Sequence, residues 1–166
     1  MGFAKYEGLG NDFVIVTGPA AAAISTVSAR TLCDRHRGIG ADGVLIVSGT
    51  PAAPRMQVIN ADGSEPEMCG NGLRCVALYL VHQGFARPGQ AFTVETDAGP
   101  HQCLVQSNAR ERGVEVSVRA PSLVPEEVPV LAERALLDEP FEVAGTRVKL
   151  SCVSMGNPHG VTCDDL

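Results

Sequence analysis

The chain has 166 residues, 45% of them hydrophobic and 19% charged, a balance typical of a folded globular protein rather than a disordered one. A formal net charge of −6 argues against a nucleic-acid partner, and no run of 18 apolar residues predicts a membrane span. The N-terminus lacks the apolar segment of a signal peptide, so we expect a cytoplasmic protein with no membrane partner. In that reducing compartment its six cysteines are predicted to be free thiols, most of them buried.

The first half of the chain alternates strand and turn signals. Short β-branched or aromatic runs predict strands at residues 3–6, 12–17, 43–48 and 55–60. Between the second and third of these runs, a helix is predicted over 28–37. Ser25 or Ser28 can cap its start, and Gly38 is placed to be its left-handed C-cap.

A second helix is predicted over 70–83 and is closed by Gly84. Its apolar residues recur at helical spacing and cover nearly the whole circumference, which is typical of a helix buried inside a domain. Strands or hairpins are predicted after it at 92–96, 101–106, 114–119, 141–143 and 146–153, with a turn at 108–112. The sequence therefore predicts an α+β fold in which a strongly curved mixed β-sheet wraps around one central helix.

Four clusters of glycine and asparagine interrupt this strand-rich pattern, at residues 8–13, 38–43, 60–75 and 156–159. Glycine lets the backbone approach a ligand closely, and an amide side chain can both donate to and accept from an amino-acid zwitterion. We therefore expect these clusters to supply the ligand-binding residues.

Cys69 is predicted to lie at the N-terminus of the second helix, before Gly70, Asn71 and Gly72. The free amides of that helix end can bind a carboxylate, and its partial positive charge favours a thiolate. A base beside a carboxylate-binding site is what removal of an α-proton from an amino acid requires. The alternative interpretation of Cys69 is an inert N-cap residue.

The other reactive side chains point less clearly to chemistry. Cys75 is predicted to be a core cysteine, because helical periodicity turns it inward. His159 is a candidate partner base for a thiolate, or an exposed loop histidine. His36 is interpreted as a cation at a helix C-terminus, and His82 and His101 as surface residues.

No cofactor or metal is predicted. Gly38, Gly40 and Gly43 match a dinucleotide-binding pattern, but they follow a helix and precede a strand, which is the wrong context. Neither of the two lysines, Lys5 and Lys149, lies in the setting of a pyridoxal phosphate site, and the cysteine spacing does not fit zinc.

Five segments, taken in order along the chain, closely resemble diaminopimelate epimerases. They are Gly-Leu-Gly-Asn-Asp-Phe-Val (8–14), Asp-Arg-His-Arg-Gly-Ile-Gly-Ala-Asp-Gly (34–43), Asn-Ala-Asp-Gly-Ser (60–64), Met-Cys-Gly-Asn-Gly-Leu-Arg-Cys (68–75) and Ser-Met-Gly-Asn-Pro-His (154–159). The resemblance implies an isomerase of lysine biosynthesis that interconverts LL- and meso-diaminopimelate with two cysteines and no cofactor. The fold that it implies has two pseudo-symmetric domains around a substrate cleft, in a protein expected to be a homodimer.

The resemblance also implies roles for seven residues. Cys69 is one of the two proton-transferring cysteines, and His159 assists its thiol. The remaining five are implied to bind substrate: Asn11, Asn60, Gly70, Asn71 and Asn157.

The chain departs from the family pattern in two ways. Gly43 stands where many members carry a substrate-contacting Gln. The second-domain cysteine and its Glu-Arg and Ala-Cys-Gly motifs have no match, so residues 1–166 are expected to be an N-terminal domain without its C-terminal partner, inactive alone.

Other functions stay open on the sequence. A phenazine-biosynthesis-type isomerase or a proline racemase would share the architecture. A single domain that binds an amino acid without catalysis, or a redox or metal protein built on the cysteines, belongs to a different class.

Overall fold

The computed structural model describes residues 2–107 and 113–164, which belong to two compact units, Met1–Ser117 and Val118–Leu166. In the first unit, seven strands form one sheet in chain order. They are β1 (Ala4–Gly8), β2 (Asn11–Thr17), β3 (Gly43–Thr50), β4 (Ala53–Asn60), β5 (Phe92–Thr96), β6 (Gly99–Val105) and β7 (Val114–Val116). The pairs β2–β3 and β4–β5 are parallel and the others antiparallel, which confirms the predicted mixed sheet.

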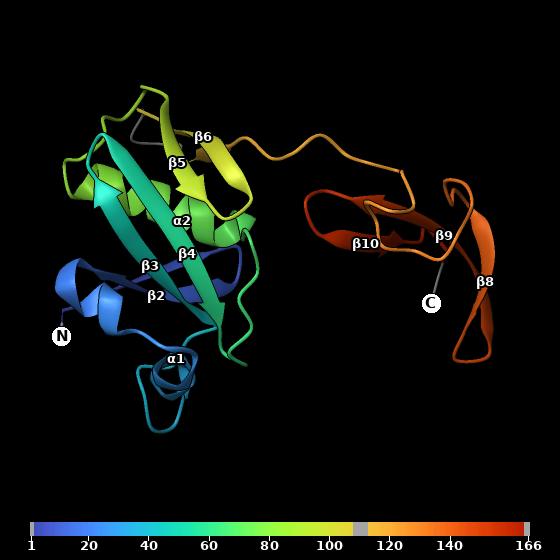
Figure 1. Cartoon of the computed structure of the whole chain (residues 1–166), viewed down its shortest axis with the longest axis horizontal. Helices are drawn as coiled ribbons and strands as arrows, with labels where there is room; N and C mark the ends of the chain where they lie inside the picture. The colour runs from blue at the N-terminus through green and yellow to red at the C-terminus, as the bar shows by residue number, and fades with distance from the viewer. Residues whose placement is uncertain (1, 108–112, 165–166) are drawn as a thin grey trace. The chain divides into compact units, whose positions relative to one another are not determined.

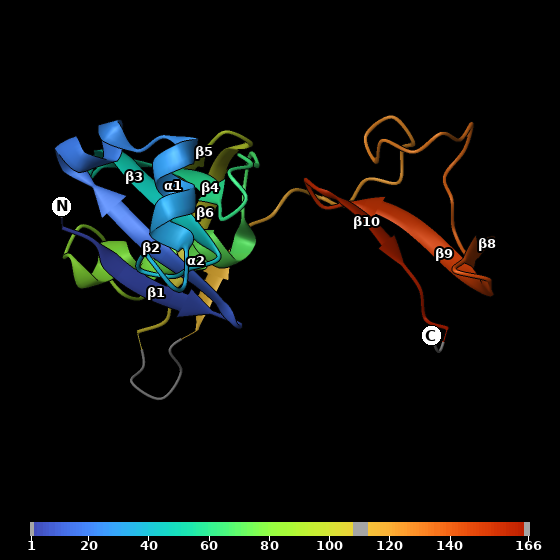
Figure 2. The ribbon, with the colours of Figure 1, turned by 90° about the horizontal axis from the view of Figure 1, so that it is seen from below.

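Each parallel pair is joined by a helical crossover, as parallel strands require. The short 3-10 helix η1 (Gly18–Ala23) and helix α1 (Thr26–Cys33) link β2 to β3, and helix α2 (Gly70–His82) links β4 to β5. Helix α2 contacts β1 and β7, the two edges of the sheet, as well as strands between them, so the sheet curls around it (Figures 1 and 2). None of the described helices is long and apolar enough to cross a membrane.

Strand β2 shows why the sheet is covered on both faces. Its side chains alternate between two cores, because successive residues of a strand point to opposite faces. Phe13 and Ile15 join the cluster around α2, whereas Val14 and Val16 join a second cluster that includes Ala29 of α1. All four β2 side chains are at most 2% exposed.

Helix α1 ends four residues earlier than predicted, at Cys33 instead of residue 37. Ser25 is its N-cap and forms a capping box with Ser28. At the other end, the Asp34 carboxylate accepts from the backbone amides of the next turn, and the amides of Ile39 and Gly40 donate to the carbonyl of Leu32. The returning loop thus satisfies the helix end, and Gly38 does not adopt the left-handed conformation that was expected of it.

The prediction that His101 is a surface residue is wrong. Its side chain is only 6% exposed, and its Nδ1 lies 2.8 Å from the carbonyl oxygen of Ser117. His101 shares the inward face of β6 with Cys103 and Val105, so the period-two alternation of that strand carried the signal. The turn expected at 108–112 lies outside the described residues.

The second unit contains a three-stranded antiparallel sheet. Its strands are β8 (Glu139–Val143), β9 (Thr146–Ser154) and β10 (Pro158–Val161), with β9 in the middle. The predicted hairpin at 141–153 is confirmed as β8 and β9. Strand β10 was not predicted, because it is short, begins with proline and directly follows the turn at Gly156 and Asn157.

The first turn of α2 tolerates a methyl group at one glycine but not at another. A Cβ at Gly72 would lie 2.8 Å from Cδ2 of the fully buried Leu45, whereas a Cβ at Gly70 would meet only Arg74 Nη1, at 4.0 Å. We expect Gly72→Ala to lower the free energy of unfolding by about 1–3 kcal/mol through overpacking.

Gly70→Ala is the matched control and should be neutral or stabilising by up to about 1 kcal/mol, because alanine favours the helix. Urea unfolding followed by tyrosine fluorescence measures both variants. The chain has no tryptophan, and its two tyrosines, Tyr6 and Tyr79, both belong to the first unit. Equal stability of the two variants would show that α2 does not pack as tightly on Leu45 as described.

Candidate functional site

Cys69 is the N-cap residue of α2, as predicted. Its backbone is extended, its carbonyl accepts from the amide of Leu73, and its Sγ accepts from the amide of Gly72 at 3.4 Å. The amides of Gly70 and Asn71 have no partner within the helix, as in the first turn of any helix. Three free amides were expected at this helix end, but the Gly72 amide donates to the sulfur. The helix end therefore presents two free amides beside a half-buried thiol.

A tight hairpin brings Asn11 to this helix end. Leu9 and Gly10 form a two-residue turn between β1 and β2, both with positive φ, and Asn11 is the first residue after it. Gly8 lies against α2, where a Cβ would be 3.6 Å from the carbonyl oxygen of Asn71. Asn71 Nδ2 donates to Asn11 Oδ1 at 2.5 Å. The structure thus brings together four of the seven predicted residues at one end of α2.

Asn60 lies at the end of β4 and is held by its own loop. Its Nδ2 donates to Ser64 Oγ at 2.9 Å, and its backbone amide donates to the Ser64 carbonyl. The next residue, Ala61, donates its amide to the carbonyl of Asp42, whose carboxylate accepts from Asn11. The loop at 60–64 is therefore tied to the same polar group as Asn11.

Gly43 is buried where β3 pairs with both β2 and β4. A Cβ there would lie 3.0 Å from the carbonyl oxygen of Ile59 and 3.4 Å from the Phe13 ring. A side chain at this position, such as the Gln implied by the resemblance, would require these neighbours to move by a few tenths of an ångström.

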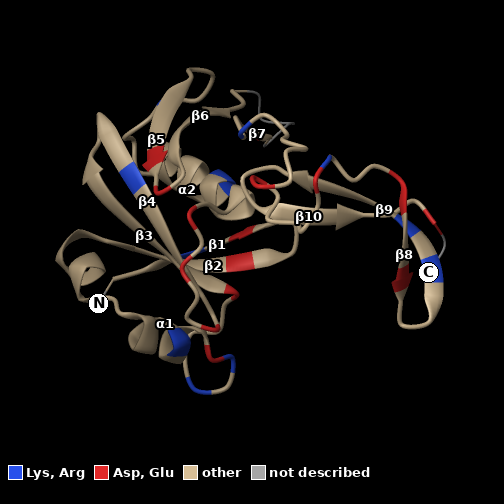
Figure 3. Cartoon of the chain, turned by 45° about the vertical axis from the view of Figure 1, so that its right-hand side comes forward, with Lys and Arg blue, Asp and Glu red and all other residues tan. Residues whose placement is uncertain are grey.

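Four charged residues that the sequence reading did not assign to the site form a network behind Asn11. Arg35 donates to both carboxylate oxygens of Asp12 and to Asp42 Oδ1, and Lys5 forms a 2.9 Å ion pair with Asp12. Hydrogen bonds from Arg35, followed by those from Lys5, hold the pKa of Asp12 well below its usual range. Figure 3 shows that basic and acidic positions lie together in the loop after α1, which contains Arg35.

Arg74 is a further residue that the sequence reading missed. It lies one turn after Asn71 on α2 and donates to Asn71 Oδ1. The three-residue spacing of the two side chains within the helix was the available signal, because residues i and i+3 are neighbours on a helix surface.

Asn157 and His159 lie together in the second unit. His159, on β10, has its Nε2 3.0 Å from Asn157 Oδ1, and both side chains are exposed. Cys69 belongs to the first unit, and each unit is described by itself. The assistance of Cys69 by His159 therefore stays a prediction.

Cys75 and Cys103 are buried, whereas Cys69 is only half-buried. Cys75 is 3% exposed, which confirms it as a core residue. Burial, followed by the neighbouring Cys69 and Glu7, raises the pKa of its thiol to about 11, and burial raises that of Cys103 to about 11. Within residues 2–107 and 113–164, no three His, Cys, Asp or Glu side chains are grouped so as to hold a metal ion.

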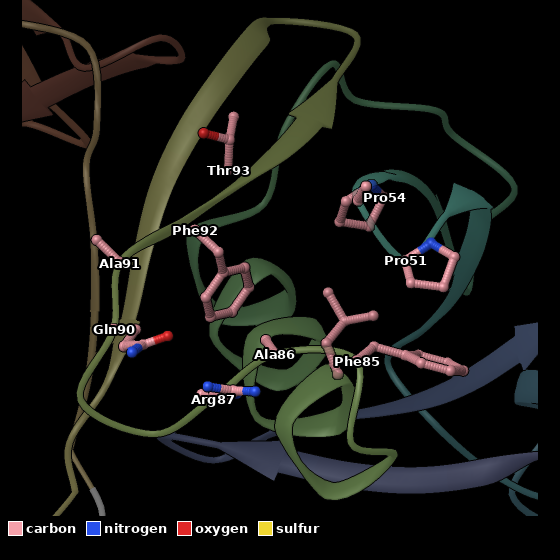
Figure 4. Close-up of a pocket in the computed structure, with 11 residues that line it drawn as sticks. Pro51, Pro54, Phe85, Ala86, Arg87, Gln90, Ala91, Phe92 and Thr93 are labelled. Carbon is pink, nitrogen blue, oxygen red and sulfur yellow. The ribbon is translucent and has the colours of Figure 1, made fainter.

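Two adjoining cavities in the first unit lie near the other end of α2. Figure 4 shows one of about 280 Å³, lined by Pro51, Phe85 and Arg87 among others. The second, of about 400 Å³, shares Pro51 and Phe85 and adds Tyr79. Cys69 lines neither cavity, and their walls are mostly apolar or neutral, so we do not assign the chemistry to them.

Solved structures define the fold class. The chain resembles a probable proline racemase from Agrobacterium radiobacter (TM-score 0.69, 15% identity) and a hydroxyproline epimerase from Agrobacterium vitis (0.67, 13%). It also resembles a phenazine biosynthesis protein of the PhzF family from Bacillus anthracis (0.62, 20%). Each match covers 96% of this chain and 50–54% of the other chain. At these identities the likeness shows the fold, which confirms the curved mixed sheet around a central helix.

The sequence comparison defines the family. The model of the diaminopimelate epimerase family matches residues 3–124, and the chain belongs to that family. It is 45% identical to diaminopimelate epimerase of Moorella thermoacetica over 97% of its length, and 40% identical to that of a Picosynechococcus species over 96%. The chain spans 59% of the length of each of these relatives.

The lowered pKa of Asp12 predicts how the first unit responds to pH. Because the ionised carboxylate is favoured in the folded state, its contribution is present above the ordinary aspartate pKa and is lost as the pH falls below it. We expect Asp12→Asn to cost about 1–2 kcal/mol at pH 7. That difference should stay constant down to about pH 5 and shrink below about pH 4.

Urea unfolding by tyrosine fluorescence between pH 3 and 7 checks this dependence. Asp97→Asn is the matched control, because Asp97 pairs with Arg55 at the surface and such pairs contribute little. A difference between wild type and Asp12→Asn that persists unchanged at pH 3 would contradict the role given to the Asp12 carboxylate.

Proposed function

We propose that this chain is the first half of a diaminopimelate epimerase, an isomerase of lysine biosynthesis that interconverts LL- and meso-diaminopimelate without a cofactor. The observation that carries the proposal is the Cys69 thiol at the N-terminus of α2, next to two backbone amides and the side chains of Asn11 and Asn71. A cytoplasmic homodimer that binds this small amino acid belongs to the same proposal.

The geometry suits removal of a proton from the α-carbon of an amino acid. The amides of Gly70 and Asn71 bind the α-carboxylate, and the helix dipole favours its negative charge. The Cys69 thiolate takes the α-proton, and the electron pair left on carbon is delocalised into that carboxylate. The hydrogen bond from the Gly72 amide to Sγ stabilises the thiolate before the proton arrives.

The second half of the reaction needs a proton donor on the opposite face of the substrate. We assign that role to a second cysteine thiol outside these 166 residues, on the missing C-terminal domain. The length of the relatives supports this assignment, since the chain spans only 59% of each. In this proposal residues 1–166 alone do not epimerise diaminopimelate.

Asn157 and His159 are proposed to join the site from the second unit, Asn157 as a substrate ligand. The carbonyl oxygen of the Asn157 side chain can only accept a hydrogen bond, so His159 Nε2 donates to it. That pairing leaves Nδ1 of the neutral imidazole as the acceptor, which is the form that can take the proton of a thiol. His159 is thereby prepared to convert Cys69 to its thiolate.

A cysteine comparison in the full-length protein tests the proposal. Cys69→Ala should lower the rate of diaminopimelate epimerisation by at least ~10³-fold, because the variant has no base on one face. Cys75→Ala is the matched control. It should keep near-normal turnover and lose about 1–2 kcal/mol of stability, since it removes a buried sulfur.

The substrate is checked by α-proton exchange in deuterated water, read by mass spectrometry. Diaminopimelate should exchange and proline should not. Exchange of proline alone would replace the proposal with a racemase of that class, and normal turnover in Cys69→Ala would remove the cysteine from the mechanism.

A further inference from the structure

Asp42 lies at the centre of the polar network behind the candidate site. Its Oδ2 accepts from Asn11 Nδ2 at 3.2 Å and from the backbone amide of Asp12 at 3.0 Å. Its Oδ1 accepts from Arg35 at 2.8 Å. Both oxygens are thus engaged, and one of them holds a residue that the proposed function assigns to substrate.

The hydrogen bonds through Asn11 and Asn71 run in one direction. Arg74 donates to Asn71 Oδ1, Asn71 Nδ2 donates to Asn11 Oδ1, and Asn11 Nδ2 donates to Asp42. An arginine can only donate and a carboxylate can only accept. The charged groups at the two ends therefore fix the orientation of both amides. If either amide turned over, a donor would face a donor and an acceptor would face an acceptor.

This orientation determines what the two amides can offer a ligand. Each asparagine keeps one N–H and one carbonyl lone pair outside the relay. Together they can offer a ligand two donors and two acceptors, which matches the carboxylate and the ammonium group of one amino acid. With an amide turned over, a donor would replace an acceptor at the same place.

The ion pair between Asp42 and Arg35 is too exposed for its presence to be explained by folding stability alone. The side chain of Asp42 is 37% exposed and that of Arg35 is 54% exposed. Ion pairs with this much access to water contribute little to folding. Its contribution to the arrangement of the site is the stronger reason for its presence.

We propose that Asp42 is a positioning residue, which acts through Asn11 to hold the Asn11–Asn71 pair in its substrate-binding orientation. The inference rests on the proposed function, in which both asparagines contact diaminopimelate. Asp42 itself does not touch the substrate in this account.

Steady-state kinetics of the full-length protein test the role of Asp42. Asp42→Ala and the isosteric Asp42→Asn should raise the KM for diaminopimelate about tenfold or more, with a smaller change in kcat, because they weaken binding rather than proton transfer. Asp97→Asn, which breaks the separate Arg55–Asp97 pair, should leave KM unchanged. Melting temperatures of all variants separate these effects from loss of fold.

A double-mutant cycle shows whether Asp42 acts through Asn11. If it does, Asp42→Asn should change KM little further in a protein that already carries Asn11→Ala. Independent effects that multiply would overturn the inference. An increase in KM with Asn11→Ala but not with either Asp42 variant would overturn it too, and would leave the proposed function intact.

A spectroscopic readout does not depend on activity. In the ¹H–¹⁵N spectrum of the unliganded protein, Asp42→Asn should shift the side-chain NH₂ signals of Asn11 and Asn71, and Asp97→Asn should not. Unchanged signals would refute the relay, whether or not the protein is active on diaminopimelate. Inactivity on diaminopimelate would contradict the proposed function, and this is a separate outcome.

Discussion

Helix α2 begins inside the curve of a sheet whose two edge strands both contact it, and the site depends on where its first turn lies. The apolar residues of the helix bury against strands on every side, so the helix cannot slide or rotate without exposing core. Gly72 brings its N-terminus close to Leu45, and Gly8 lets the β1–β2 hairpin lie against the same turn. Packing of apolar side chains alone thus fixes the position of the backbone amides next to Cys69.

Polar contacts then set the orientation of the side chains that packing has brought together. Asn11 and Asn71 come from elements 60 residues apart and meet only because the hairpin and the helix touch. Each amide has two nearly isosteric orientations, and packing does not distinguish them. The charges of Arg74 and Asp42 do distinguish them, so these two contacts have a definite consequence for ligand recognition.

The sequence predicted the parts of the molecule that follow from local periodicity. The β-branched and aromatic strand runs and the apolar circumference of α2 indicated a curved sheet around a buried helix, and the glycines beside asparagines marked Cys69, Asn11 and Asn71. The predicted end of α1 was wrong because the helix is ended by contacts of Asp34 and of the loop that returns to Leu32. The burial of His101 was overlooked although the alternation of β6 carried it.

The charged network could not be predicted from local sequence patterns, for a different reason. Lys5 and Asp12 come from β1 and β2, and Arg35 and Asp42 come from the loop between α1 and β3. The pairing of the strands and the return of that loop place the four side by side. The motifs that contain Asp12, Arg35 and Asp42 show which segments matter. They do not show that the acidic and basic side chains of those segments contact one another.

The most direct test of the account is an experimental structure of the full-length protein with diaminopimelate bound. We expect one carboxylate of the ligand within hydrogen-bonding distance of the Gly70 and Asn71 amides, and Cys69 Sγ facing the adjacent α-carbon. A ligand bound instead in the cavities near Phe85, with the first turn of α2 unoccupied, would contradict the assignment of the site.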